Sequence, residues 1–285
     1  MGFLRVTDND LILYRYLFEQ DFLTRDQIKN FVWKDLSNGH INNRLARLTR
    51  EGYIKKHPDL SAGMGSVLMA GSGAVGLLNN DDIIERMMNL KSSFINKEKF
   101  IRAYSEREKL NFARYNHDEY LTDVRFKLEI LAKEYMSYRM LMVYNRNVKG
   151  KNKKEKLKKK FTRPTPDALM KDSDDVIAIE LENTLKQDFR YQDKIFRGYV
   201  MNQNVDMVLY ICTNKSVFKG VEDNINKFFK KGYIEEKGKS FKISDTRFLV
   251  ADYEQVMKGK SFTATNYKTE YGERKLIDKC EFNFN

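Results

Sequence analysis

The chain has 285 residues, of which 41% are apolar and 32% are charged. This length predicts two globular domains of roughly 100–180 residues, and the content of 15 Gly, 3 Pro and 2 Cys excludes collagen-like and disulfide-rich scaffolds. No apolar run is long enough to span a membrane, and the first six residues lack the layout of a signal peptide. Two isolated cysteines are typical of a reducing compartment, so we expect a cytoplasmic protein.

Three short helices followed by a two-stranded hairpin are predicted for the first seventy residues. Apolar residues at helical spacing predict a helix over 8–20. Thr24 and Gln27 have the spacing of a capping box that opens a second helix, and a third, capped by Ser37 or Asn38, ends before Gly52. Residues 53–57 and 66–70 predict paired strands. This order is typical of a winged helix-turn-helix, which we assign to residues 1–78.

Polar side chains follow one face of the third predicted helix. Asn43, Arg47 and Arg50 are spaced i, i+4, i+7 opposite the apolar stripe, and Lys55 and Lys56 begin the hairpin. Arginine and asparagine pair with base edges in the major groove of duplex DNA, and lysines contact phosphates. We therefore expect these five residues to bind double-stranded DNA. The alternative is a winged helix used for packing or for forming a homodimer.

A helical linker is predicted for residues 79–110, and a helical pattern then runs from residue 110 toward 138. Apolar positions alternate spacings of four and three along this second stretch. His117 lies on its apolar side. A histidine in the core is the plain interpretation, and an accessory histidine that points into a nearby site is the functional one.

The net charge of +12 is concentrated in one segment. Residues 146–163 hold ten Lys or Arg and one Glu, a net of +9, so the other 267 residues carry only +3. Nucleic acid would neutralise such a block, with counterion release driving the association. The alternatives are a solvated loop without a partner and, as a minor option, an anionic membrane surface. The basic side chains that we expect to contact DNA are Lys153, Lys154, Lys158, Lys159 and Arg163.

Four charged residues gather around two predicted strands between residues 168 and 182. Glu180 and Glu182 are two apart on one strand, so they point to the same face. Asp167 comes from the neighbouring strand, and Lys186 follows shortly after. Carboxylate oxygens suit a hard divalent cation, which could activate a water for attack on a phosphodiester. The plain alternative is a set of surface charges on an edge strand.

Pro166-Asp167, followed by Glu180-Leu-Glu182 and Lys186, resembles the PD-(D/E)xK core of restriction-endonuclease-like nucleases. With the N-terminal winged helix, the chain is similar to replication-relaxation proteins of plasmids and other mobile elements, and in layout to mobilisation relaxases built on the nuclease fold. The resemblance spans residues 5–255. It implies Mg²⁺ or Mn²⁺ at Asp167 and Glu180, and a catalytic group of Asp167, Glu180, Glu182 and Lys186. Glu182 stands where the common pattern has lysine, and Lys186 could supply the missing positive charge.

The remaining segments fit the same core. Residues 205–212 predict a strand buried on both faces, 215–231 a basic amphipathic helix, and 247–251 a final strand. We therefore expect an α+β or α/β chain in which a mixed sheet flanked by helices spans residues 111–255. Residues 256–285 are expected as a polar C-terminal extension, either docked or loose.

The resemblance implies a DNA-binding protein of a plasmid or mobile element that nicks or cleaves DNA at an origin of replication or transfer. The alternative is a non-catalytic accessory factor of replication or transfer, or a transcriptional regulator. Metal binding at Asp167 and Glu180 separates the two hypotheses. The sequence has no Gly-rich phosphate loop, zinc-ligand cluster or serine triad. We therefore expect no nucleotide cofactor, and no membrane partner.

Overall fold

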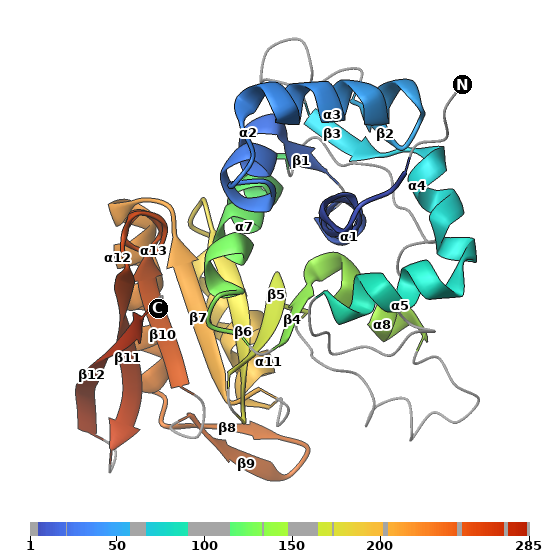
Figure 1. Cartoon of the computed structure of the whole chain (residues 1–285). Helices are drawn as coiled ribbons and strands as arrows, with labels where there is room; N and C mark the ends of the chain where they lie inside the picture. The colour runs from blue at the N-terminus through green and yellow to red at the C-terminus, as the bar shows by residue number, and fades with distance from the viewer. Residues whose placement is uncertain are drawn as a thin grey trace. The chain divides into compact units, whose positions relative to one another are not determined.

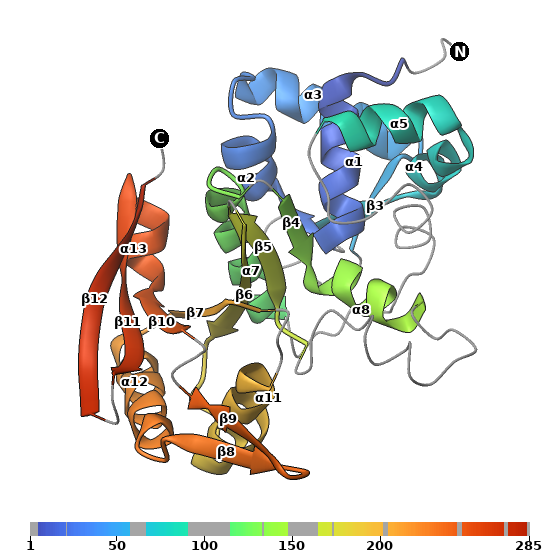
Figure 2. The ribbon, with the colours of Figure 1, turned by 90° about the horizontal axis from the view of Figure 1, so that it is seen from below.

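The structure of the chain, a computed structural model, is mixed α+β (Figures 1 and 2). It divides into two units, Met1–Thr122 and Asp123–Asn285, which are described separately below. The described residues are 5–20, 22–57, 67–90, 115–132, 134–147, 165–172, 174–201, 205–243, 247–270 and 273–283.

The first unit combines helices with a small antiparallel sheet of strand order β1-β3-β2. Its elements are α1 (Asp8–Gln20), β1 (Leu23–Thr24), α2 (Arg25–Gln27), η1 (Ile28–Val32), α3 (Asn38–Arg50), β2 (Ile54–Lys56), β3 (Val67–Ala70), α4 (Ser72–Gly76), η2 (Leu77–Asn79), α5 (Asp81–Asn89) and the first half of α7 (Tyr115–Leu128).

Local signals in the sequence determine where these helices begin and end. The capping box at α2 is confirmed: the Gln27 N–H donates to Thr24 Oγ1 at 3.2 Å, and the Thr24 N–H donates to Gln27 Oε1 at 3.0 Å. Ser37 caps α3 by accepting from the His40 N–H at 3.3 Å. Gly52 follows α3 with φ of 74°, a left-handed conformation that glycine adopts without strain.

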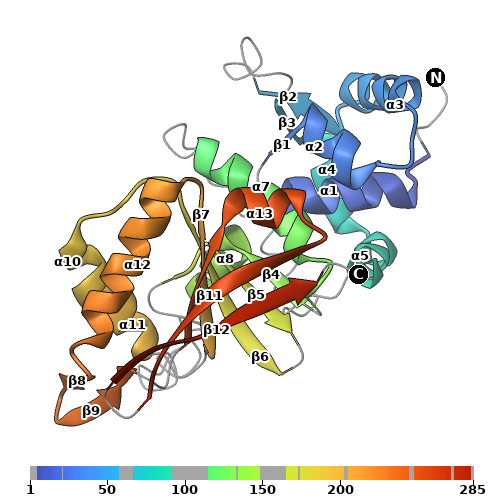
Figure 3. The same cartoon turned by 90° about the vertical axis from the view of Figure 1, so that its left-hand side faces the viewer.

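The second unit is built on a mixed seven-stranded sheet flanked by helices, which confirms that part of the predicted fold (Figure 3). The strands β6, β7 and β10 are parallel at its centre, and antiparallel strands lie on both sides. In spatial order the strands are β12 (Glu273–Asn283), β11 (Ser261–Glu270), β10 (Arg247–Asp252), β7 (Met207–Cys212), β6 (Asp175–Glu182), β5 (Ala168–Asp172) and β4 (Glu134–Ser137). The other elements are the second half of α7, α8 (Tyr138–Asn147), α10 (Asp188–Arg190), η4 (Tyr191–Phe196), α11 (Arg197–Val200), α12 (Lys215–Phe229), α13 (Tyr253–Lys258) and a separate ribbon of β8 (Tyr233–Glu236) and β9 (Lys239–Lys242).

An aromatic cluster holds the helices against the central strands. The Phe196 ring lies 5.9 Å from Tyr210, 5.3 Å from Phe228 and 5.2 Å from Phe248, measured between ring centroids. All four side chains are buried. Every residue of β7 is buried, as the nearly continuous apolar run predicts for a parallel strand covered on both faces. Tyr210 of this aromatic cluster is paired in the β6–β7 register with Glu180, one of the predicted carboxylates.

Two segments differ from the expected organisation. The helical pattern predicted to run toward residue 138 ends at Leu128, and residues 134–137 form β4, because their backbone pairs with β5. The tertiary pairing therefore overrides the local helical periodicity. Residues 261–270 and 273–283, expected within a polar extension, form β11 and β12 of the main sheet. Most of the predicted 79–110 linker, from residue 91 onward, lies outside the described residues.

Candidate functional site

Strand register brings the predicted acidic residues to one place in the second unit. Ala168 of β5 pairs with Ile179 of the antiparallel strand β6. Asp167 precedes Ala168 and Glu180 follows Ile179, so these two residues are neighbours across the strands. One carboxylate oxygen of Asp167, Oδ2, accepts a hydrogen bond from the Leu181 N–H at 3.0 Å. Glu180 and Glu182 are both buried on β6. Charge interactions connect Glu180 to Asp167, Glu182 and Lys186, so the four predicted residues form one cluster, named here the carboxylate cluster.

Glu180 is a buried carboxyl whose pKa is strongly shifted within the carboxylate cluster. Burial raises its pKa to about 8, and the nearby Asp167 carboxylate contributes to the same shift. The Tyr199 hydroxyl donates a hydrogen bond to Glu180 Oε1 and, together with the Lys186 ammonium, opposes this shift. Glu180 therefore holds its proton near neutral pH unless a further cation approaches.

Lys186 supplies the positive charge of the carboxylate cluster. Its ammonium pairs with the Glu182 carboxylate, and the two side chains are 27% and 2% exposed. The ammonium also lies 5.7 Å from the centre of the buried Tyr191 ring. Lys186 thus faces the carboxylates from the bend that follows β6, and its other side is open to solvent.

Two buried tyrosines belong to the carboxylate cluster although the sequence gives no signal for them. Tyr210 lies beside Glu180 because β6 and β7 are parallel in that register. Its hydroxyl is buried, and it has no hydrogen-bond partner within the described part of the chain. Tyr199 reaches Glu180 from α11. Burial raises the pKa of both phenols well above the ordinary value, so both hydroxyls keep their protons.

The oxygen donors of the carboxylate cluster fit a hard divalent cation by their chemistry. Asp167 and Glu180 lie next to each other, and the burial that raises the pKa of Glu180 leaves a carboxyl group whose charge a cation would stabilise. Among the described residues, however, no group of three or more His, Cys, Asp or Glu side chains is arranged to hold a metal ion. Leu181, Tyr199 and Lys186 each bind one of the carboxyls instead.

His117, predicted as a possible accessory residue, lies in α7 within the first unit. Its Nδ1 is 3.2 Å from Asp118 Oδ1, and its side chain is 22% exposed. It is therefore only partly buried. Since the carboxylate cluster belongs to the second unit, an accessory role for His117 stays a prediction.

The predicted DNA-contacting side chains of the first unit are exposed on α3 and β2. Asn43, Arg47 and Arg50 lie on the open face of α3, opposite the buried stripe of Ile41, Leu45 and Leu48. Lys55 and Lys56 are exposed on β2. A groove of about 460 Å³ runs beside this face. Its lining residues are Arg25, Asn42, Leu45, Ala46, Thr49, Arg50, Lys56 and Leu68.

The groove beside α3 includes two residues that the helical spacing did not identify. Arg25 of α2 binds the Asn42 side chain of α3, and both residues are exposed. Arg25, Arg50 and Lys56 thus place positive charges from three elements around an apolar floor. Arg25 lies far from α3 in sequence, so only the tertiary structure identifies it.

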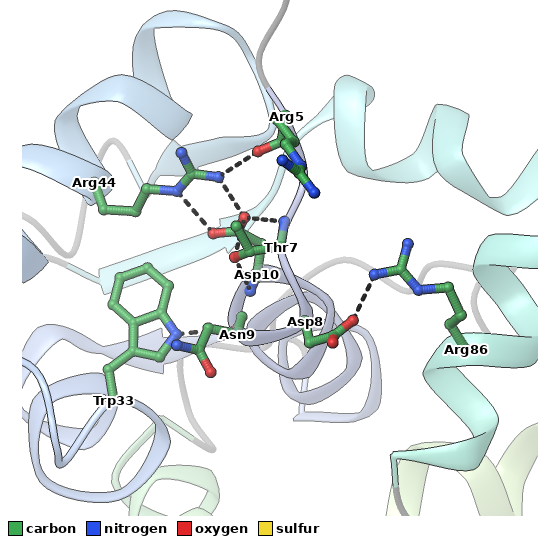
Figure 4. A network of polar contacts seen from close by, with 8 residues as sticks. All are labelled: Arg5, Thr7, Asp8, Asn9, Asp10, Trp33, Arg44 and Arg86. Atoms are coloured by element: carbon green, nitrogen blue, oxygen red, sulfur yellow. Dashed lines mark hydrogen bonds and ion pairs between the residues drawn. The ribbon is translucent and has the colours of Figure 1, made fainter.

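A polar network anchors the other side of α3 to the start of α1 (Figure 4). The Arg44 guanidinium donates from Nε to Asp10 Oδ1 at 2.9 Å and from Nη2 to the Arg5 carbonyl at 2.9 Å. The Thr7 N–H donates to Asp10 Oδ2 at 2.7 Å, and Trp33 Nε1 donates to the Asn9 carbonyl at 3.0 Å. Asp10 raises the pKa of Arg44, which stays charged. The Arg44 side chain is therefore held in contacts within the first unit, whereas Arg47, one turn away, lies on the open face.

Residues 148–164, which include Lys153, Lys154, Lys158, Lys159 and Arg163, lie outside the described residues. Within the described residues, no helix combines the length and the apolar character needed to cross a bilayer.

Comparison with known proteins gives no match to the chain among family models, curated proteins or solved structures.

Proposed function

We propose that the protein is a DNA-binding protein of a plasmid or mobile element that cuts or nicks DNA at an origin of replication or transfer. The observation that carries the proposal is the convergence of Asp167, Glu180, Glu182 and Lys186 at the carboxyl end of β6. Two acidic residues contributed by neighbouring strands at this end of the sheet are typical of a PD-(D/E)xK nuclease, and Lys186 stands in for the lysine that Glu182 replaces. The three parallel central strands and the helix α12 that follows β7 support this assignment.

Asp167 and Glu180 are the residues that would hold Mg²⁺ or Mn²⁺. When bound, such an ion polarises a phosphodiester and lowers the pKa of a water molecule. Tyr199 orients the Glu180 carboxyl through its hydrogen bond. Lys186, which is partly exposed beside Glu182, would stabilise the negative charge that develops on the phosphate. Glu182 holds this lysine in place.

The first unit would recognise duplex DNA as a winged helix-turn-helix. Its order of helices followed by the β2–β3 pair supports this interpretation, and α3 is the element that would enter the major groove. Asn43 and Arg47 would contact base edges. Arg25, Arg50 and Lys56, which line the groove beside α3, would contact phosphates.

A non-catalytic accessory factor or regulator is the second candidate, and one observation favours it. A protein donor already binds each carboxyl of the carboxylate cluster, and Glu182 occupies the position where the nuclease pattern has lysine. Such a core could hold DNA without cutting it. This candidate keeps the winged helix and the DNA partner, and it needs no metal.

Incubation with supercoiled plasmid carrying the DNA around the protein's own gene tests the proposal. We expect relaxed or linear product with Mg²⁺ or Mn²⁺, no product with EDTA, and no product from Glu180→Gln. Glu180→Gln should still bind DNA, because α3 lies in the other unit. Plasmid that stays supercoiled with wild-type protein, while DNA binding persists, would support the accessory candidate.

A further inference from the structure

The ribbon of β8 and β9 stands apart from the seven-stranded sheet. Its two strands pair only with each other in the described structure. The turn between them is Lys237-Gly238, with φ of 51° and 75°. Two successive residues in this region are typical of the tight type I′ hairpin turn. Figures 2 and 3 show the ribbon outside the main sheet, beside α11 and α12.

The ribbon is held at its root and near its turn, while part of its surface is open to solvent. Ile234 and Ile243 are buried. The Arg197 guanidinium of α11 lies 3.4 Å from the Glu236 carboxylate and donates to the Glu235 carbonyl at 3.4 Å. Tyr233 is 57% exposed and pairs across the strands with Lys242, which is also exposed. The ribbon is thus a positioned surface element.

The ribbon and the two lysines just before it are basic. The ribbon itself, residues 233–242, holds three Lys and two Glu, a net of +1, and Lys230 and Lys231 bring residues 230–242 to a net of +3. Since residues 146–163 contribute +9 of the total of +12, the remaining 254 residues sum to zero. Glu236 is paired with Arg197. Lys237, Lys239 and Lys242 are exposed and form no ion pair with any described residue.

We infer, resting on the proposed DNA-binding function, that the β8–β9 ribbon is a second contact for duplex DNA, separate from α3 and from the carboxylate cluster. A two-stranded ribbon fits the major groove, which is about 12 Å wide. Lys237, Lys239 and Lys242 form no ion pair within the described residues, and Glu236, which lies opposite Lys239, is paired with Arg197, so the phosphates bordering the groove are a matching partner for these lysines. The exposed Tyr233 adds a rigid side chain that can contact the sugar and base edges.

The ribbon and the carboxylate cluster lie at opposite ends of the parallel strands. β7 ends at Cys212, α12 runs back along the sheet, and the ribbon follows α12 before β10 begins parallel to β7. Glu180 and Glu182 instead lie at the carboxyl end of β6. A strand of six residues separates these ends by about 20 Å. The ribbon therefore contacts a different stretch of DNA from the one that would enter the carboxylate cluster.

Salt titration of full-length protein on a random-sequence duplex tests this inference. The variant Lys237→Gln/Lys239→Gln/Lys242→Gln should bind more weakly at low salt. The slope of log K against log salt should fall in magnitude by roughly 0.9 for each phosphate that the variant no longer neutralises. The matched variant Lys237→Arg/Lys239→Arg/Lys242→Arg keeps the charge and should keep the wild-type slope. Thermal melting of both variants should match wild type, since these side chains are exposed.

Equal slopes for wild type and the glutamine variant would overturn the inference, and would also leave an acidic protein as the better partner for the ribbon. A slope reduced in the arginine variant as much as in the glutamine variant would overturn it too, because charge would not be the cause. Neither outcome depends on metal or on nicking. A failure of the ribbon contact is therefore distinguishable from a failure of the nuclease proposal.

Discussion

Glu180 couples the stability of the second unit to pH. Its pKa is raised to about 8 in the folded protein because the side chain is buried, whereas an exposed glutamate titrates near its ordinary value of about 4.3. Between these two pH values the folded state binds more protons than the unfolded state, so stability falls as pH rises. The contribution is fully present below the unfolded pKa and is lost as pH rises through the folded pKa.

We therefore expect the free energy of unfolding of metal-free wild-type protein to decrease by a few kcal/mol between about pH 5 and pH 8, since each pKa unit corresponds to about 1.4 kcal/mol. Urea denaturation in EDTA across this range measures the decrease. Glu180→Gln, which cannot ionise, should remove most of it. A wild-type profile as flat as that of Glu180→Gln would show that Glu180 titrates normally.

Tyr199 and Tyr210 form a matched pair for testing how much a tyrosine hydrogen bond stabilises the carboxylate cluster. Both rings are fully buried, but only the Tyr199 hydroxyl has a described partner, Glu180. Tyr199→Phe should lower the free energy of unfolding by about 1–3 kcal/mol, because it leaves a buried carboxyl without its donor. Tyr210→Phe should change it by well under 1 kcal/mol, since this variant removes no hydrogen bond. Equal decreases in urea denaturation would contradict this assignment.

The positions of Asp167, Glu180, Glu182 and Lys186 follow from the sequence, whereas those of the tyrosines do not. Side chains alternate along a strand, so the spacing of Glu180 and Glu182 predicts their common face without further information. Tyr210 meets Glu180 only through the register of β6 with β7, and Tyr199 only through the path of α11. Such long-range pairings leave no local pattern. The proton held by Glu180 likewise depends on burial that composition does not reveal.

At the scale of the element, α3 holds Arg44 in an ion pair within the fold and exposes Arg47 to solvent. Arg47→Ala or Asn43→Ala should weaken binding to a cognate site by about 1–3 kcal/mol, with a smaller effect on random DNA. Competition binding with cognate and random duplexes measures the difference. Arg44→Ala is the contrast on the same helix: it leaves the buried Asp10 without its ion-pair partner and should lower the melting temperature. Equal weakening by Arg47→Ala on both duplexes would mean that α3 does not read bases.

The helices of the first unit were the most predictable elements because their signals are local. Thr24 with Gln27, Ser37 and Gly52 each fix a helix end through interactions within a few residues. The short strand β1 is paired with β3 more than forty residues away, and no pattern in its two residues predicts it. Residues 134–137 carry a helical periodicity but form β4 for the same reason: a distant strand supplies their hydrogen bonds.

At the scale of the whole molecule, charge was more predictable than chain organisation. The arithmetic that concentrates +9 in residues 146–163 needs only the sequence, whereas the exposed lysines of the ribbon are identified only once its strands are known. The sheet was predictable in its centre, where apolar runs mark β6, β7 and β10. Its far edge was not, because β11 and β12 alternate polar and apolar residues as a solvated extension also can.

The late position of β11 and β12 in the chain has a consequence for biosynthesis. β10 emerges from the ribosome before the strand that covers its edge, so Phe248, Leu249 and Val250 first lie on an open, strongly apolar strand. Until residues 261–270 follow, this edge is free to pair with another nascent chain. Pairing of the β11–β12 hairpin with β10 therefore covers an apolar edge that would otherwise be open to another chain.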